Sequence, residues 1–272
     1  MSFTSQFNGE IIISFNEEDL VKNTFHSESN LKKTNHYYPD RPNIGYALII
    51  NNWEFKKKDH NRSKLDGQNL QRLFIEFGYK MYGSENHLQN LTKKEMEDKI
   101  KEFAKDSCHK NSRSAILFIA SHGNGEGVET TDNRLLEYHE IKKIFGESKS
   151  LNMIAKLILF QACHGYQEDT GISTSAKVED DSIPEALPKY CDMFVCYASY
   201  YGMKAYRCEK YGAFFIIVIC AVFYKYASCK HIAELMPIVN DYIASKPFPK
   251  NSGDYKMTST TESTLRTALF FK

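Results

Sequence analysis

The chain alternates short apolar runs with segments in which apolar residues recur every three or four positions. Three runs have the length and composition of buried strands, at residues 44–52, 114–120 and 156–162. Helical spacing predicts the intervening helices, at residues 65–77, 93–104 and 138–145. Strands that alternate with amphipathic helices indicate an α/β fold with a mainly parallel sheet, covered by helices on both faces.

The second half of the chain resumes this pattern after an interruption. Residues 166–190 are polar and contain the acidic run Glu179-Asp180-Asp181; an irregular stretch of this length inside a domain is usually functional. The pattern then predicts a strand at 192–199, an apolar helix at 213–224, a helix at 231–244 and a final strand near 265–271. Residues 1–37 are polar, which predicts a weakly ordered tail.

Composition excludes several classes of partner. With 272 residues, 42% of them hydrophobic and 25% charged, the chain has the composition of an ordinary globular protein. Its 35 basic and 34 acidic residues give a net charge of +1, and so no electrostatic reason to bind nucleic acid or an anionic membrane. Residues 213–224 are too few for a membrane span of about 20 residues, and the N-terminus has no signal-peptide pattern. We expect neither nucleic acid nor membrane as a partner.

The seven cysteines do not form a metal or disulfide framework. None of them lies in a Cys-x-x-Cys pair, and their spacing is irregular. We therefore expect no metal, no cofactor and a reducing, cytoplasmic location.

Two chemically useful side chains directly follow neighbouring strands of the predicted sheet. His122 comes after the run at 114–120, and Cys163 after the run at 156–162. In an α/β sheet, functional groups gather beyond the carboxyl ends of the parallel strands. A cysteine attacks as the thiolate, and a nearby histidine can accept its proton. Taken singly, each residue is more often a packing residue than a catalytic one, but their shared edge favours a nucleophile and its base. The segment Asp106-Ser107-Cys108-His109 also contains a cysteine next to a histidine. It follows the end of a predicted helix, however, so we expect it to be a surface loop and not the nucleophile site.

Residues 161–165, Gln-Ala-Cys-His-Gly, resemble the caspase pentapeptide Gln-Ala-Cys-x-Gly. Ser121-His122-Gly123 is similar to the caspase Ser-His-Gly, and the resemblance extends from Tyr38 to the C-terminus. His164 departs from the Arg, Gln or Gly usual at the fourth position. The resemblance implies a clan CD cysteine peptidase with the caspase–hemoglobinase fold, a three-layer αβα sandwich around a mainly parallel six-stranded sheet.

The resemblance also assigns catalytic roles. Cys163 would be the nucleophile and His122 the general base and acid. The backbone amides of Gly123 and Cys163 would form the oxyanion hole, and the carbonyl of His60 would orient His122.

Caspases select aspartate at P1 with two arginines and the pentapeptide glutamine, which correspond here to Arg62, Arg207 and Gln161. Guanidinium groups suit this task because they stay charged and bind a carboxylate with two hydrogen bonds. Tyr206 would provide an aromatic wall at P2. Cys208 and Phe214 stand at the S4 wall, so the resemblance supports no particular P4 preference.

Caspases are zymogens, which the resemblance extends to this chain. The inter-subunit linker, about residues 166–190, would be cut after Asp181 or Asp180, and the tail after Asp19. The parts would be a propeptide (1–37), a large subunit (38–181) and a small subunit (182–272). The resemblance further implies a homodimer of cleaved protomers, an effector type with a short prodomain, an upstream caspase, caspase inhibitors and a role in apoptosis.

Two alternatives remain open at this point. The chain could be a catalytically impaired caspase-like decoy that dimerises with active caspases; the changes at His164 and at Ala205-Tyr206 keep that reading open. It could also resemble clan relatives that cut after basic residues. That specificity needs acidic groups in the first pocket, whereas the matching positions here are arginines.

Overall fold

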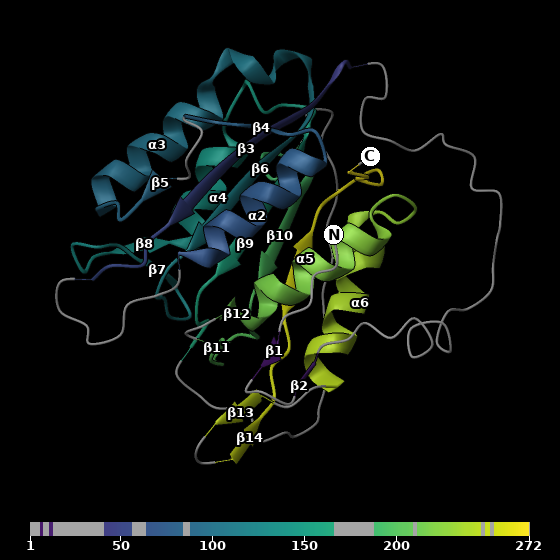
Figure 1. The fold of residues 1–272 in the computed structure, drawn as a ribbon. Helices are drawn as coiled ribbons and strands as arrows, with labels where there is room; N and C mark the ends of the chain where they lie inside the picture. The colour runs from purple at the N-terminus through teal and green to yellow at the C-terminus, as the bar shows by residue number, and fades with distance from the viewer. Residues whose placement is uncertain are drawn as a thin grey trace, which may run out of the picture.

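The computed structural model describes residues 41–55, 64–83, 88–165, 188–208, 211–245, 248–250 and 253–271, and two short strands nearer the N-terminus. At its centre is a sheet whose four longest strands run parallel and lie side by side in chain order (Figure 1). These are β3 (Asn43–Asn51), β6 (Ser112–Ala120), β9 (Ala155–Gln161) and β10 (Met193–Tyr197). The expected parallel sheet is confirmed.

Shorter strands complete the two edges of the sheet. On one edge, β4 (Lys80–Met81) and β5 (Leu88–Gln89) both pair in parallel with β3, at different points along it. On the other edge, β15 (Thr260–Ser263) runs antiparallel to β10. Within the described residues, seven strands thus occupy six positions across the sheet.

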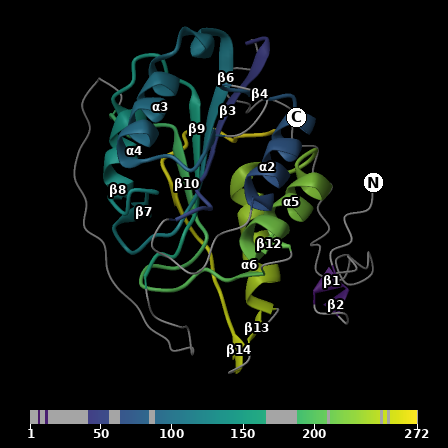
Figure 2. The same ribbon diagram turned by 60° about the vertical axis from the view of Figure 1, so that its left-hand side comes forward.

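Helices cover both faces, so the molecule has three layers (Figures 1 and 2). One layer contains α2 (Leu65–Glu76), α5 (Phe214–Tyr226) and α6 (Ile232–Ser245), and the other contains α3 (Lys93–Lys105) and α4 (Tyr138–Gly146). Successive strand side chains point to opposite faces. Ile49 and Phe118 therefore pack in the core under α2, α5 and α6, while Leu48 and Ile119 pack in the core under α3 and α4.

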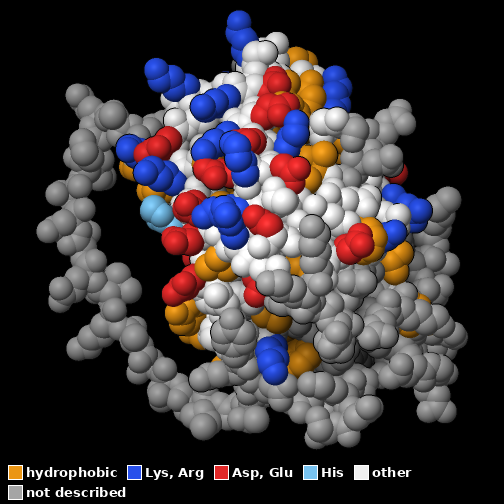
Figure 3. Space-filling model, turned by 90° about the vertical axis from the view of Figure 1, so that its left-hand side faces the viewer, with side chains coloured by type: hydrophobic (Ala, Val, Ile, Leu, Met, Phe, Trp, Pro, Cys, Tyr) orange, Lys and Arg blue, Asp and Glu red, His pale blue; other side chains and the backbone are white. Residues whose placement is uncertain are grey.

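Helix α3 begins at the predicted residue, and a capping box precedes it. The side chain of Thr92 accepts a hydrogen bond from the Glu95 amide, and the Glu95 carboxylate accepts one from the Thr92 amide at 2.9 Å. The outer face of this helix carries cations and anions interspersed (Figure 3), including the Lys94–Asp98 and Lys99–Glu102 ion pairs. Within the described part of the chain, no helix is both long and apolar enough to cross a membrane.

The predicted final strand is wrong in its position. The last strand is β15, and residues 265–271 form no strand. Their apolar side chains fill the core beneath the α5–α6 layer, where Phe271 lies 5.4 Å from Phe77 and 5.3 Å from Phe223 between ring centroids. The Leu269 carbonyl accepts a hydrogen bond from the Ile232 amide at 3.0 Å. An apolar run of residues can therefore fill a core without forming a strand.

Several short elements lie outside the central sheet and its helices. They are a 3-10 turn at Ser107–Asn111 and four antiparallel pairs: β7 (Gly127–Glu129) with β8 (Leu135–Glu137), β11 (Arg207–Cys208) with β12 (Gly212–Ala213), β13 (Phe248–Lys250) with β14 (Gly253–Tyr255), and β1 (Gln6–Phe7) with β2 (Ile11–Ile12). Apart from β1 and β2, the predicted tail lies outside the described residues, as do residues 166–187 of the predicted linker.

Candidate active site

The structure brings His122 and Cys163 to the same edge of the sheet. Strands β6 and β9 are in register through Ala120 and Gln161, and the Ser121 amide donates to the Gln161 carbonyl at 3.1 Å. His122 and Cys163 each come two residues after this matched pair, and both are partly exposed. The register therefore places them at matching positions beyond two adjacent carboxyl ends.

Gly123 closes the gap between the two strand ends. A Cβ placed on Gly123 would lie only 2.9 Å from the Ala162 Cβ and 3.1 Å from the Cys163 carbonyl oxygen. It would also lie 2.7 Å from the Gly127 carbonyl oxygen. Only glycine lets the backbone after His122 approach the peptide of Cys163 this closely.

A tight turn holds the segment that carries His122. The Asn124 side chain accepts hydrogen bonds from the amides of Glu126 (2.9 Å) and Gly127 (3.1 Å), which returns the chain into β7. The Glu129 amide then donates to the His122 carbonyl at 2.8 Å. The His122 ring packs edge-on against Phe55, with the ring centroids 4.7 Å apart. The imidazole is thus supported both by its own backbone and by a side chain beyond the end of β3.

Cys163 lies beside the loop that follows β10. Its Sγ is 3.9 Å from the Ala205 carbonyl oxygen, to which a thiol can donate a weak hydrogen bond. The next residue, His164, is buried and stacks on Tyr197 with the ring centroids 4.5 Å apart. Burial lowers the pKa of His164. His164 therefore belongs to the packing around β10, and His122 is the histidine placed beside Cys163 through Gly123.

Four of the predicted specificity residues lie in the described part of the chain. Gln161, at the end of β9, is fully buried, and Arg207 is partly buried in β11. Tyr206 is 8% exposed, and its carbonyl accepts a hydrogen bond from the Phe214 amide at 3.2 Å. Phe214 opens α5 and is 6% exposed, packed in the core of that layer.

The other predicted positions cannot be placed. Arg62 and His60 lie outside the described residues, as do the predicted cleavage positions Asp19, Asp180 and Asp181. The side chain of Cys208 is also outside the described set.

The segment at 106–109 is not a second nucleophile site, and it is more buried than the expected surface loop. His109 is fully buried, and its Nε2 lies 2.8 Å from the Phe103 carbonyl oxygen. Burial and the neighbouring Asp106 carboxylate raise the pKa of Cys108 to about 12. This thiol stays protonated, and hence unreactive, at neutral pH.

Sequence reasoning missed the loop at residues 199–205. This loop contacts Cys163 through Ala205 and contacts the backbone of His164 through Ser199 and Met203. Its one sequence signal is its place directly after β10, because that strand ends at the same carboxyl edge.

The site combines a partly exposed thiol, an imidazole at the matching position of the adjacent strand end and a close backbone turn, all at the carboxyl edge of an α/β sheet. A cysteine peptidase can use such groups as nucleophile and base. A family model described as the caspase domain matches residues 44–270, and the chain belongs to this family. The chain is 27% identical over 239 residues to caspase-3 of Oryctolagus cuniculus (84% of each chain) and to caspase-3 of Bos taurus (85% of this chain, 84% of the relative). It is 26% identical over 225 residues to caspase-3 of Mus musculus, covering 80% of this chain and 79% of the relative. The family defines the chain as a caspase-like, cysteine-type peptidase.

Proposed function

We propose that the chain is an aspartate-specific cysteine endopeptidase in which Cys163 is the nucleophile and His122 is the general base and acid. The observation that carries the proposal is the close packing of Gly123 against the Cys163 peptide, directly after His122. This packing supports a shared oxyanion site made of the Gly123 and Cys163 amides.

The reaction follows from these positions. His122 takes the proton of the Cys163 thiol, and the thiolate attacks the scissile carbonyl carbon. Negative charge on the carbonyl oxygen is stabilised by the two amides. The C–N bond breaks, His122 returns the proton to the leaving amine, and a thioester remains. Water, deprotonated by His122, then releases the acid and restores the thiol.

Arg207, Arg62 and Gln161 form the proposed P1 pocket. Gln161 is fully buried and Arg207 partly buried, so a carboxylate bound there would leave water and need fixed cationic donors. A substrate asparagine would leave two cations without an anion, at a cost on the order of 3–5 kcal/mol, or a few hundred-fold or more in specificity. Protein substrates with aspartate at P1 are the partners this pocket fits.

Activation by cleavage in the linker is compatible with the sheet. Along the chain, β9 precedes the proposed cleavage positions Asp180 and Asp181, and β10 follows them. The two strands nevertheless pair in parallel, from Lys156 through Phe160 of β9. A chain cut into a large subunit (38–181) and a small subunit (182–272) would therefore remain one folded protomer. Asp19 is the proposed position for removal of the tail.

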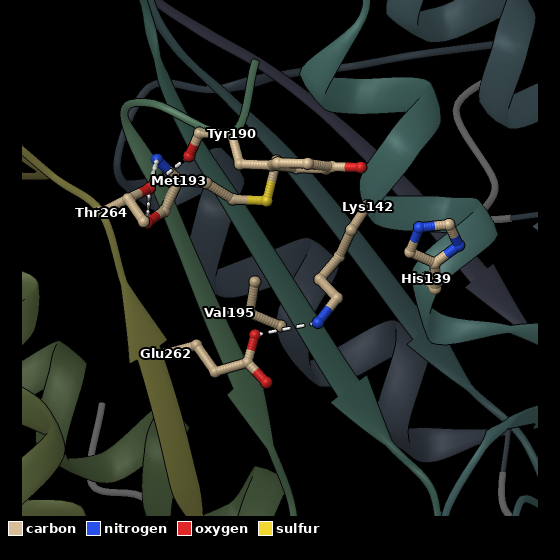
Figure 4. A pocket seen from close by; sticks show the side chains of 7 residues that line it. All are labelled: His139, Lys142, Tyr190, Met193, Val195, Glu262 and Thr264. Carbon is tan, nitrogen blue, oxygen red and sulfur yellow. Dashed lines mark hydrogen bonds and ion pairs between the residues drawn. The ribbon is translucent and has the colours of Figure 1, made fainter. Parts of the chain in front are cut away.

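The edge strand β15 supports the proposed homodimer. β15 pairs with β10 on one side, and no strand in the described part of the chain pairs with its other side. A pocket of about 280 Å³ opens between β10, β15 and α4 (Figure 4), lined by apolar side chains such as Tyr190 and by the Lys142–Glu262 ion pair. An unpaired strand edge is a feature that a second copy would cover.

The setting we propose is the reducing cytoplasm, where a catalytic thiol and free cysteines persist. All six cysteines whose side chains are described are free thiols. Apoptosis, with an upstream caspase and caspase inhibitors, is the cellular role that accompanies this specificity in the proposal.

Peptide libraries varied at P1 test the function directly. A linker-cut sample should cleave after aspartate, and Cys163→Ala should abolish the cleavage. Cys229→Ala is the matched control because Cys229 is an exposed cysteine beyond α5, and this variant should retain full activity. No cleavage after aspartate would overturn the proposal in favour of a caspase-like decoy, and cleavage after Arg or Lys would overturn the P1 pocket.

A further inference from the structure

His164 lies beside the proposed nucleophile but has no role in the chemistry above. Only 9% of its surface is exposed. Its Nδ1 is buried and has no hydrogen-bond partner among the described residues. Burying a polar atom without a hydrogen-bond partner is unfavourable, so other contacts of this ring must offset the cost.

Three tyrosines from separate elements surround the His164 ring. Tyr197 of β10 stacks on its face, with the ring centroids 4.5 Å apart and the planes 8° from parallel. Tyr138 of α4 and Tyr201 of the loop after β10 each meet it edge-on, with centroids 5.3 Å away. The ring therefore fastens the turn after Cys163 to α4, to β10 and to the loop that follows β10.

The backbone of the same turn is bonded to the same loop. The His164 amide donates to the Met203 carbonyl (3.1 Å) and lies 3.2 Å from the Ser199 hydroxyl, and the His164 carbonyl accepts from the Gly202 amide at 2.7 Å. A Cβ on Gly165 would lie 2.1 Å from the Gly202 carbonyl, so the two backbones are in direct contact.

This loop also reaches Cys163 and the proposed P1 pocket. The Cys163 Sγ lies 3.9 Å from the Ala205 carbonyl, and Tyr206 and Arg207 follow directly in the chain. A displacement of the His164 ring would therefore move the thiol and the pocket together.

Charged groups from several elements lie near the ring. The titratable groups that line the cavity beside it, about 500 Å³ in volume, are Glu126 before β7, Tyr138, His139 and Lys142 of α4, Tyr197 of β10, Tyr200 and Tyr201 of the following loop, and Glu262 of β15. Glu262 and Lys142 form an ion pair of 2.9 Å (Figure 4), so neither is a dedicated partner for a charged imidazole.

We propose that His164 is a positioning residue whose neutral ring holds Cys163 in its reactive place, and that protonation of this ring loosens the turn. The inference rests on the proposed function, because it gives His164 a role through the nucleophile.

The direction of the effect agrees with the packing. Burial lowers the pKa of His164, opposed more weakly by the Ser199 backbone and the Glu262 carboxylate. The folded site therefore favours the neutral ring. The stabilisation that the neutral His164 ring gives to the folded site is complete above the ordinary histidine pKa of about 6.5. This stabilisation is lost as the pH falls below that value towards the lowered pKa.

The rate at which iodoacetamide alkylates Cys163, followed by peptide mass spectrometry, tests this role without requiring peptidase activity. His164→Phe keeps a planar ring that can stack but cannot titrate. Near pH 7.5 the wild type and this variant should react within about twofold of each other. As the pH is lowered below about 6.5, the wild type should fall progressively behind the variant, by about threefold or more once the His164 ring is protonated. The other titratable groups are common to both proteins, so their effects cancel in the ratio.

Two comparisons keep the test decisive. His139→Phe changes an exposed histidine that lines the same cavity and should retain the wild-type pH profile. His164→Gln replaces the ring with a neutral side chain and should reproduce the pH profile of His164→Phe, which covers the case in which the phenylalanine variant does not fold. A wild-type to variant ratio that is the same at every pH would reduce His164 to a packing residue and overturn the proposal. Failure of the wild type to cleave peptides after aspartate would instead overturn the proposed function, and the alkylation ratio would still decide the role of His164.

Discussion

Replacing Gly123 with alanine tests whether the backbone after His122 serves the reaction. The new methyl group would stand 2.7 Å from the Gly127 carbonyl oxygen, about 0.7 Å inside the 3.4 Å at which ordinary contact begins. It would also crowd the Ala162 Cβ at 2.9 Å and the Cys163 carbonyl oxygen at 3.1 Å. Two of these three neighbours are backbone atoms, so the chain at Gly123 itself has to move.

The size of the effect follows from that movement. A shift of several tenths of an ångström takes an amide out of good hydrogen-bond geometry with an oxyanion. Loss of one such donor lowers kcat by about 100- to 1,000-fold, or about 3–4 kcal/mol. Crowding of this kind also lowers the free energy of unfolding by about 1–3 kcal/mol. Because the donor acts on the transition state, kcat should fall while KM changes little.

The assay is steady-state cleavage of an aspartyl peptide by linker-cut protein, with thermal unfolding recorded in parallel. Gly146→Ala is the matched control, because its Cβ would meet the Lys189 carbonyl oxygen at 2.8 Å, a similar crowding of backbone that lies before the start of β10, at the edge of the sheet opposite to Cys163. The control should keep kcat within about twofold. A folded Gly123→Ala protein with kcat within about threefold of the wild type would refute the role of the Gly123 amide.

Three further predictions concern stability and assembly. Asp192 is 1% exposed and accepts hydrogen bonds of 2.8 and 2.6 Å from Arg266, so Asp192→Asn should lower the unfolding free energy in urea by about 2–3 kcal/mol. The comparison variant is Lys94→Ala, which breaks a surface ion pair worth under about 1 kcal/mol. If Asp192→Asn loses no more stability than Lys94→Ala, the prediction is wrong. Burial lowers the pKa of Lys156 to about 8, so the unfolded chain, in which a lysine titrates near 10.4, binds more protons than the folded chain between those values. Stability relative to Lys156→Met should therefore rise by about 2–3 kcal/mol from pH 8 to about 10.4, and a pH-independent difference would count against it. In sedimentation, the linker-cut protein should have twice the mass of a protomer at micromolar concentration; a protomer mass under those conditions would remove the β15-edge dimer.

The layers of the fold follow from the sequence because its local signals agree with one another. The apolar runs at 114–120 and 156–162 form β6 and β9, and the helical spacing at 93–104 corresponds to α3. The final strand was misplaced because residues 265–271 are apolar for a different reason. Leu269 and Phe271 fill the core under α5 and α6, whereas β15 is an edge strand of polar residues whose pairing is set by its neighbour β10.

The candidate site was only partly predictable. The rule that functional groups follow parallel strands places His122 and Cys163 at one edge, and the register of β6 and β9 agrees. The roles of Arg62, Arg207 and Gln161 came from the resemblance to caspases and not from any pattern of spacing. The surroundings of His164 depend on Tyr138, Tyr197 and Tyr201, and no local signal indicates that these rings meet.

The most direct test of the central claim is covalent labelling with a short peptide that ends in an aspartyl chloromethyl ketone, mapped by mass spectrometry. We expect a single adduct on Cys163 and much slower labelling in His122→Ala. We also expect little labelling by the matching asparaginyl reagent, which lacks the charge that Arg207 and Arg62 are proposed to bind. Labelling spread over exposed thiols such as Cys229, or equal labelling by the two reagents, would refute the proposed nucleophile and P1 pocket.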